Sequence, residues 1–178
     1  MTTLTPPQLG SYAIDTSEST LTFRTRHLFG LAPVKGSFTI TGGTVDVAEP
    51  AARSAIRAEI DAASFRTRNP LRDQTVRSAR FLDTGRHPVI TFSAGAAQGP
   101  ALAATRPGSG GLTVPGTLTV RGTTRPVSLE VELLATGPGP VTARATARID
   151  RTEFGVTALR GLAARYINVT LDIRCVRR

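Results

Sequence analysis

Apolar and polar residues alternate with a period of two along most of this chain. Successive side chains of a β-strand point to opposite faces, so the alternation predicts strands that bury one face and expose the other. The pattern runs through residues 20–29, 34–40, 44–47, 54–62, 88–94, 112–120, 126–134, 141–149 and 166–174. About eight long strands with short turns are typical of an all-β sandwich or barrel, so we expect an antiparallel β-fold.

The inward faces predicted from this alternation carry both large and small side chains. The large ones include Phe23, Phe38, Ile40, Phe92 and Leu118. The small ones are Gly36, Gly116, Ala143, Ala145 and Ala147, which leave space that leucine or phenylalanine would occupy. The pattern therefore supports an interior cavity, although the same strands could also close over a packed core.

One short helix is expected between the strands. Asn69 and Pro70 offer an N-cap followed by a proline at the first helical position, which predicts a helix over residues 70–79. Leu71, Thr75 and Val76 are spaced so that they would touch the barrel from this helix.

Glycine-containing segments predict two further connections. Gly42 and Gly43 predict a tight turn between two strands. Residues 98–111 are rich in glycine and proline, which predicts a long mobile hairpin loop between strands of one sheet.

The chain carries a net charge of +9, with 22 lysine and arginine residues against 13 aspartate and glutamate residues. Lys35 is the only lysine, and the arginines are spread along the sequence, which favours solvated strand faces over a clustered polyanion site. A basic nucleic-acid-binding β-barrel remains the alternative interpretation. Steep weakening of binding with salt would distinguish it, because phosphate contacts are salt-dependent.

The sequence shows no pattern typical of a catalytic or metal site. It lacks a Gly-x-Ser-x-Gly elbow, and the glycine-rich residues 107–111 lack the following lysine of a phosphate-binding loop. Asp73, Asp83 and Glu153 would form a carboxylate pair only by accident of the fold. His27 and His87 are the only histidines and have no ligands at metal-binding spacing. We therefore expect no catalytic residues, no metal and no enzyme activity.

The single cysteine, Cys175, excludes an internal disulfide and is expected to be a packed thiol within a strand.

The role of His27 is open to two interpretations, since alternation places its side chain on the inward face with Phe23 and Phe29. A buried imidazole needs a hydrogen-bond partner. It could be an interior histidine bonded between two strands, or a polar group on a cavity wall that orients a ligand headgroup.

The chain is expected to form one domain over residues 11–178, preceded by a flexible segment at residues 1–10. The first residues have neither a basic start nor an apolar run, so we expect no signal peptide and a cytoplasmic location. No stretch approaches the roughly 18 consecutive apolar residues of a membrane-spanning helix.

A series of motifs occurs in a fixed order along residues 11–173. They are Tyr12-Ala-Ile-Asp15 with Ser17 and Ser19, Phe23-x-x-x-His27-Leu28, Val34-x-Gly36-x-Phe38, Ile60-Asp61-x-x-Ser64-x-x-Thr67, Asp73-x-x-x-Arg77-Ser78-x-Arg80-Phe81-Leu82-Asp83, His87-Pro88-x-Ile90-x-Phe92, Gly116-x-Leu118-Thr119-Val120-Arg121-Gly122-Thr123-Thr124-Arg125-Pro126-Val127 and Arg151-x-x-Phe154-Gly155. Together they resemble the YceI-like family.

The resemblance implies an all-β fold, an eight-stranded antiparallel lipocalin-like barrel with one short α-helix, whose pore holds a polyisoprenoid or similar amphiphile. Such a protein would be a carrier or sequestering protein in isoprenoid transport or storage, with a link to bacterial stress. No cofactor other than a bound lipid is implied. Expected partners are the lipid, a membrane in transient contact and a second copy in a homodimer, but no specific nucleic acid.

The residues expected to contact the ligand combine the inward positions with the family motifs. Phe81 and Phe154 would plug or flank the pore, and arginines near an opening would meet a pyrophosphate headgroup. The full set is Phe23, His27, Phe38, Ile40, Phe81, Phe92, Leu118, Ala145 and Phe154.

Overall fold

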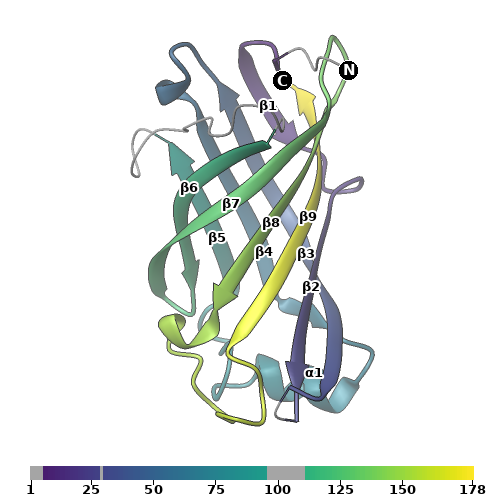
Figure 1. Ribbon diagram of the computed structural model, residues 1–178, viewed down its shortest axis with the longest axis vertical. Coiled ribbons are helices and arrows are strands. Elements are labelled where there is room, and N and C mark those ends of the chain that lie inside the picture. The colour runs from purple at the N-terminus through teal and green to yellow at the C-terminus, as the bar shows by residue number, and fades with distance from the viewer. Residues whose placement is uncertain (1–5, 29, 96–110) are drawn as a thin grey trace.

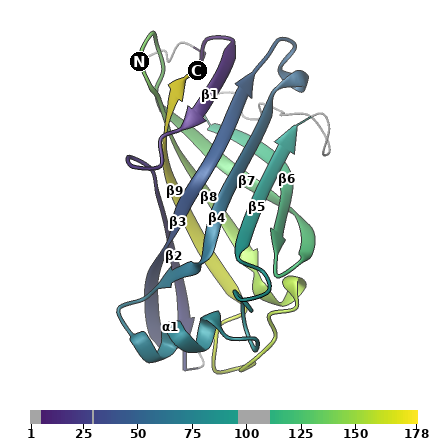
Figure 2. The same cartoon turned by 180° about the vertical axis from the view of Figure 1, so that it is seen from behind.

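The computed structural model describes residues 6–28, 30–95 and 111–178, which form a closed antiparallel β-barrel (Figures 1 and 2). Its strands are β1 (Gly10–Ile14), β2 (Thr20–His27), β3 (Ala32–Val47), β4 (Ala55–Arg66), β5 (Val89–Gly95), β6 (Gly111–Val120), β7 (Thr123–Ala135), β8 (Val141–Asp150) and β9 (Tyr166–Arg177). Helix α1 is Pro70–Arg77, and two 3₁₀-helices lie at Ala51–Arg53 and Arg151–Phe154. Phe29 and the loop predicted at residues 98–111 lie outside the described residues, apart from Gly111, with which β6 begins.

Eight strand positions close the ring, which confirms the predicted barrel, and one position is shared by β1 and β2. β2 pairs with β3 and β9 towards the α1 end, which we call the helix end. β1 continues both pairings towards the opposite end, where the C-terminus also lies (Figure 1). Pairing of β3 with β4 completes the closure, so every long strand has a neighbour on both sides.

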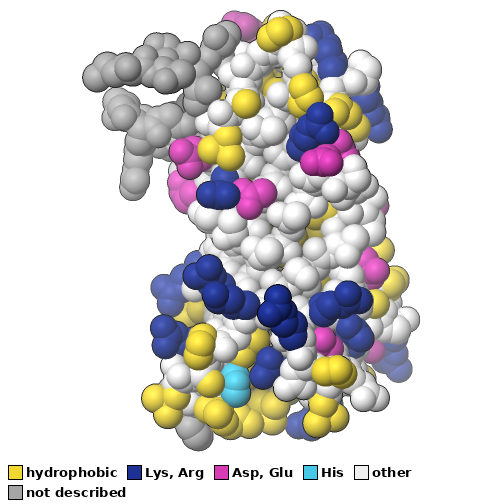
Figure 3. Space-filling view, turned by 90° about the vertical axis from the view of Figure 1, so that its right-hand side faces the viewer, with side chains coloured by type: hydrophobic (Ala, Val, Ile, Leu, Met, Phe, Trp, Pro, Cys, Tyr) yellow, Lys and Arg dark blue, Asp and Glu magenta, His cyan; other side chains and the backbone are white. Residues whose placement is uncertain are grey.

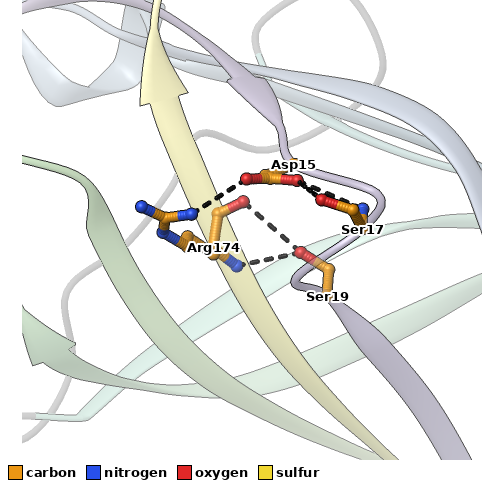
Figure 4. Close-up of polar contacts among 4 residues, drawn as sticks. All are labelled: Asp15, Ser17, Ser19 and Arg174. Atoms are coloured by element: carbon orange, nitrogen blue, oxygen red, sulfur yellow. Dashed lines mark hydrogen bonds and ion pairs between the residues drawn. The ribbon is translucent and has the colours of Figure 1, made fainter.

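The break between β1 and β2 is held against β9 by a polar cluster (Figure 4). Asp15 Oδ2 accepts a hydrogen bond from Arg174 Nη1 at 3.0 Å, and Asp15 Oδ1 accepts one from Ser17 Oγ at 2.6 Å. Ser19 Oγ accepts a third from the Arg174 backbone N at 3.0 Å. The Ser17 hydrogen bond, with the charge of Arg174, lowers the pKa of Asp15. This cluster explains the Asp-x-Ser-x-Ser part of the opening motif.

Helix α1 forms where the capping pair predicted it. Asn69 Oδ1 accepts a hydrogen bond from the Arg72 backbone N at 3.0 Å, as an N-cap residue does. Thr75 and Val76 face the barrel interior, whereas Leu71 reaches only its rim and is 75% exposed. No helix among the described residues is both long and apolar enough to cross a membrane.

The tight turn predicted at Gly42 and Gly43 is wrong, because β3 runs without interruption through both residues. The pairing register of β3 with β4 shifts between Ile40 and Gly42, which marks a bulge. A Cβ atom at position 43 would lie 2.5 Å from the carbonyl oxygen of Arg57 and would overlap Ile14. Gly43 therefore permits a close approach of two strands, a role that glycine also has inside sheets.

The inward facing of the strands is confirmed, but the space expected at two glycines is already filled. A Cβ atom at position 36 would overlap the ring of Phe23 and lie 2.5 Å from the carbonyl oxygen of Arg66. A Cβ atom at position 116 would lie 2.5 Å from Cζ of Phe92. Gly36 and Gly116 thus accommodate aromatic rings from neighbouring strands and do not themselves enlarge a cavity.

This packing predicts a large difference between two glycine substitutions in the same strand. Gly36→Ala should lower the free energy of unfolding by about 1–3 kcal/mol, the usual cost of overpacking. Gly42→Ala is the control, because nothing lies within 4 Å of its Cβ position, and its change should stay within about 0.5 kcal/mol. Urea unfolding of both variants measures the difference. Equal stabilities would contradict the assignment of Gly36 as a ring-packing site.

Candidate ligand-binding cavity

The barrel encloses a cavity of about 1400 Å³, to which inward side chains of every strand contribute. Ligand pockets usually measure about 300–1,000 Å³, so this one is large enough for a bulky or long molecule. An eight-stranded barrel has an interior that side chains can just fill, and the cavity exists because many of the inward side chains are small or medium-sized. The wall of β8 carries Ala143, Ala145 and Ala147, opposite the larger residues of β4 and β5.

Eight of the nine residues predicted to contact a ligand line this cavity. They are Phe23, His27, Phe38, Phe81, Phe92, Leu118, Ala145 and Phe154. Ile40 corrects the prediction, since it is buried and pairs with Ile60 in a core cluster instead of lying on the cavity wall. Ile40 still faces inward, so the period of two predicted its face, but neighbouring residues of that cluster cover it.

The aromatic residues of β2, β3 and β4 form one contact group inside the barrel. The ring centroid of Phe23 lies 5.6 Å from that of Phe38 and 5.2 Å from that of Phe65. Phe38 and Phe65 meet edge to face at 5.5 Å. The alternation in the sequence does not reveal Phe65, because β4 extends past the predicted end and an irregular register between Asp61 and Arg66 breaks its period of two. The signal available in the sequence was a large apolar residue at an odd position, directly after a series of inward residues at even positions.

A second cluster lies at the helix end of the cavity, where Phe81, Phe154 and Val156 are buried together. Leu118 and Val120 of β6 pack against this cluster. Phe81 follows α1, and Phe154 belongs to the 3₁₀-helix after β8. Both phenylalanines, predicted to plug or flank the pore, line the cavity at this end.

Arg151 is the buried cation of this end. Its guanidinium donates hydrogen bonds to the carbonyl oxygens of Ala164 at 2.8 Å, Val156 at 2.7 Å and Ala163 at 3.1 Å. Burial lowers the pKa of Arg151, and repulsion from Arg160 adds to that effect, yet arginine stays charged in proteins. Three carbonyl bonds thus fix the returning segment to the barrel and leave a positive charge beside the cavity.

The two ends of the cavity differ in the charges that line them. Arg26, His27, Arg72 and Arg151 line the helix end, whereas the opposite end has Asp46 and Glu49. His27 is half-buried, and no hydrogen bond of its imidazole is formed within the described residues. This favours the interpretation of His27 as a polar group on the cavity wall over that of a histidine bonded between strands.

Two further residues considered for chemistry, Asp73 and Cys175, have structural roles in the fold. Asp73 is buried and accepts hydrogen bonds from the backbone N of Thr67 at 3.0 Å and from its hydroxyl at 2.6 Å. Cys175 is buried on the cavity wall, and burial raises the pKa of its thiol to about 11. Within the parts of the chain that the structure describes, no group of three His, Cys, Asp or Glu side chains is placed to hold a metal ion.

Comparison with known proteins gives both sequence relatives and structural neighbours. A UPF0312 protein of Yersinia enterocolitica is 32% identical over 162 residues, covering 87% of this chain and 79% of that protein. A UPF0312 protein of Vibrio parahaemolyticus is 27% identical over 179 residues, covering 96% and 89% respectively.

Two solved structures have the same fold at low sequence identity. BcnA of Burkholderia cenocepacia superposes with a TM-score of 0.74 at 20% identity, covering 90% of this chain and 98% of that one. A polyisoprenoid binding domain from Saccharophagus degradans superposes with a TM-score of 0.70 at 16% identity, covering 96% and 100%. The family model of the YceI-like domain matches residues 12–176. With nearly the whole barrel inside that match, the chain belongs to the YceI-like family.

Proposed function

We propose that this protein binds a long-chain amphiphile, a polyisoprenoid or similar lipid, inside its barrel and acts as a carrier or sequestering protein. The observation that carries the proposal is the large apolar cavity, to which every strand contributes. The structural similarity to a polyisoprenoid binding domain supports the same ligand class. The family and this neighbour suggest a binding protein, so we propose no catalytic step.

The apolar side chains of the cavity wall favour an apolar, chain-like ligand. Each CH₂ group removed from water contributes about 0.8 kcal/mol, so a long chain binds without directed polar contacts. Water is a poor occupant of such a space, because a buried water needs two to four polar partners. The middle of the cavity offers mainly valine, leucine, isoleucine, alanine and phenylalanine side chains.

The charges at the cavity ends give the ligand a direction. We place an anionic or strongly polar headgroup at the helix end, near Arg26, Arg72 and Arg151, with the chain running towards Cys175. A guanidinium has five N–H donors, and Arg151 uses three of its own in the carbonyl bonds described above. Arg26 and Arg72 also retain donors, since Arg26 donates to the Gly30 carbonyl and Arg72 to the Thr67 hydroxyl.

The positions of the aromatic residues count against the nucleic-acid alternative. Proteins that bind single strands display exposed aromatic rings on which bases stack. Every phenylalanine that the structure describes instead lines the cavity: Phe23, Phe38, Phe65, Phe81, Phe92 and Phe154. Tyr166 is an exposed ring, and the guanidinium of Arg148 already lies 4.0 Å from its centroid.

A bulky side chain on the cavity wall should block the ligand. Ala145→Phe should abolish uptake of a fluorescent fatty-acid or isoprenoid analogue while leaving the melting temperature near the wild-type value, because the ring enters open space. Thr146→Phe is the matched control, since Thr146 is the next residue of β8 and is exposed on the outer face. Loss of stability by about 1–3 kcal/mol in Ala145→Phe would show that this level of the barrel is packed solid. Unchanged uptake would show that the chain does not pass this wall.

The buried thiol gives a second test that needs no substitution. With its pKa raised to about 11, the thiolate fraction of Cys175 rises with pH throughout the range below that value. The rate of alkylation should therefore increase about tenfold per pH unit between about pH 8 and pH 10. A bound long-chain amphiphile should slow alkylation at each pH by covering the thiol. An alkylation rate that the amphiphile leaves unchanged would contradict a chain reaching this part of the cavity.

A further inference from the structure

The positive charge of the protein is concentrated at the helix end. Residues 24–35, 66–88, 120–125 and 148–166 form the connections at this end with the adjoining strand residues. These four segments carry 15 lysine and arginine residues and 4 aspartate and glutamate residues. The other described residues carry 6 and 9, so the rest of the barrel is slightly acidic. Essentially all of the net charge of +9 thus belongs to one end.

Few of these cations are neutralised by neighbouring carboxylates. Of the four ion pairs formed among the described residues, only Arg165 with Asp150 lies in the helix-end segments. Several other arginines bond to backbone carbonyls, as Arg121 does to Ala79 and Gly155. Carbonyl bonds fix the side chain but leave its charge uncompensated, so this end keeps a strong positive potential.

The same end exposes large apolar side chains. Leu31 is 82% exposed and Leu71 is 75% exposed, and Leu28, Leu159 and Leu162 are also exposed. Figure 3 shows lysine and arginine side chains in a band across the lower part of the molecule, with hydrophobic side chains below them towards the tip. Most of the acidic side chains in this view lie in the upper part. At this end, apolar side chains thus form a tip that lies beyond a band of cationic side chains.

The exposed leucines also form the rim of the cavity. Leu28, Leu71, Leu159 and Leu162 line the cavity while remaining partly open to solvent, so the cavity reaches the surface between them. The segments are adjacent in space, since the backbone N of Leu28 donates a hydrogen bond to the carbonyl oxygen of Leu162 at 2.8 Å. If this rim touches a lipid phase, an apolar molecule can pass from the lipid into the cavity without being exposed to water.

From these observations we propose that the helix end docks on the surface of an anionic lipid bilayer and that the amphiphile passes between bilayer and cavity through this rim. The leucines insert among the acyl chains, and the arginine band lies at the level of the negatively charged headgroups. The transfer step rests on the proposed function, whereas docking does not. A polynucleotide would account for the cations but gives the exposed leucines nothing apolar to contact.

Sedimentation with phospholipid vesicles tests docking directly. At low salt the wild-type protein should bind vesicles of phosphatidylcholine with about one quarter phosphatidylglycerol, and only weakly bind phosphatidylcholine alone. Raising NaCl from about 0.05 to about 0.5 M should release most of it, because screening shortens the reach of the arginines. Equal binding to neutral and anionic vesicles would overturn the proposal.

Matched variants separate the two contributions. Leu31→Ser should weaken vesicle binding about fivefold, whereas Leu134→Ser, near the opposite end and 47% exposed, should not change it.

The double variant Arg80→Gln with Arg160→Gln should weaken vesicle binding more than tenfold, since each juxtamembrane cation contributes about a fivefold factor. Arg53→Gln with Arg178→Gln removes the same charge from the other end and should have little effect. All four arginines are exposed, so folding is preserved. Equal effects of the two double variants on vesicle binding would overturn the assignment. So would tight RNA binding that competes with vesicles and is unchanged in Leu31→Ser.

A transfer measurement distinguishes failure of docking from failure of lipid binding. Ala145→Phe should sediment with anionic vesicles like the wild type but should not extract a fluorescent long-chain amphiphile from them. Leu31→Ser should extract it slowly while taking it up normally from solution. Uptake from solution without any vesicle binding would overturn only the docking proposal. Vesicle binding without uptake in either assay would overturn only the proposed function.

Discussion

The structure depends on one constraint, that eight paired strands must close a ring whose inner face is apolar. Closure leaves no long strand without a neighbour, and it fixes which residues share the interior. β1 and β2 satisfy it as one interrupted strand, with Asp15 and Ser19 bonded to Arg174 across the gap. Because the alanines of β8 are too small to fill the enclosed space, closure produces a cavity instead of a solid core.

The interior of the barrel and its helix end differ in the side chains that they present. The interior is suited to hold an apolar chain, and its aromatic residues are packed inward where they contact one another. The helix end combines a buried guanidinium, a cationic band and exposed leucines around the cavity rim. This division gives the barrel a polarity that matches an amphiphile, and it links the proposed lipid binding to a surface at which lipid can be exchanged.

Sequence periodicity predicted the inner face of nearly every strand, because a half-buried strand must alternate. It failed near departures from regular pairing: at Gly42 and Gly43, which directly follow a bulge within an uninterrupted strand, and at Phe65 after an irregular register. It also could not show that Phe23 already fills the space beside Gly36. The concentration of charge was hidden for a topological reason. In an antiparallel meander, alternate connections lie at the same end, so arginines that are scattered along the sequence gather in space.

The central claim is that the cavity holds the apolar chain of an amphiphile in the folded protein. Native mass spectrometry of protein purified without detergent, before and after incubation with long-chain amphiphiles, tests it most directly. We predict a complex of one ligand per chain, whose additional mass disappears after extraction with organic solvent and is not acquired by Ala145→Phe. A folded protein that remains unliganded with every long-chain compound offered would contradict the account.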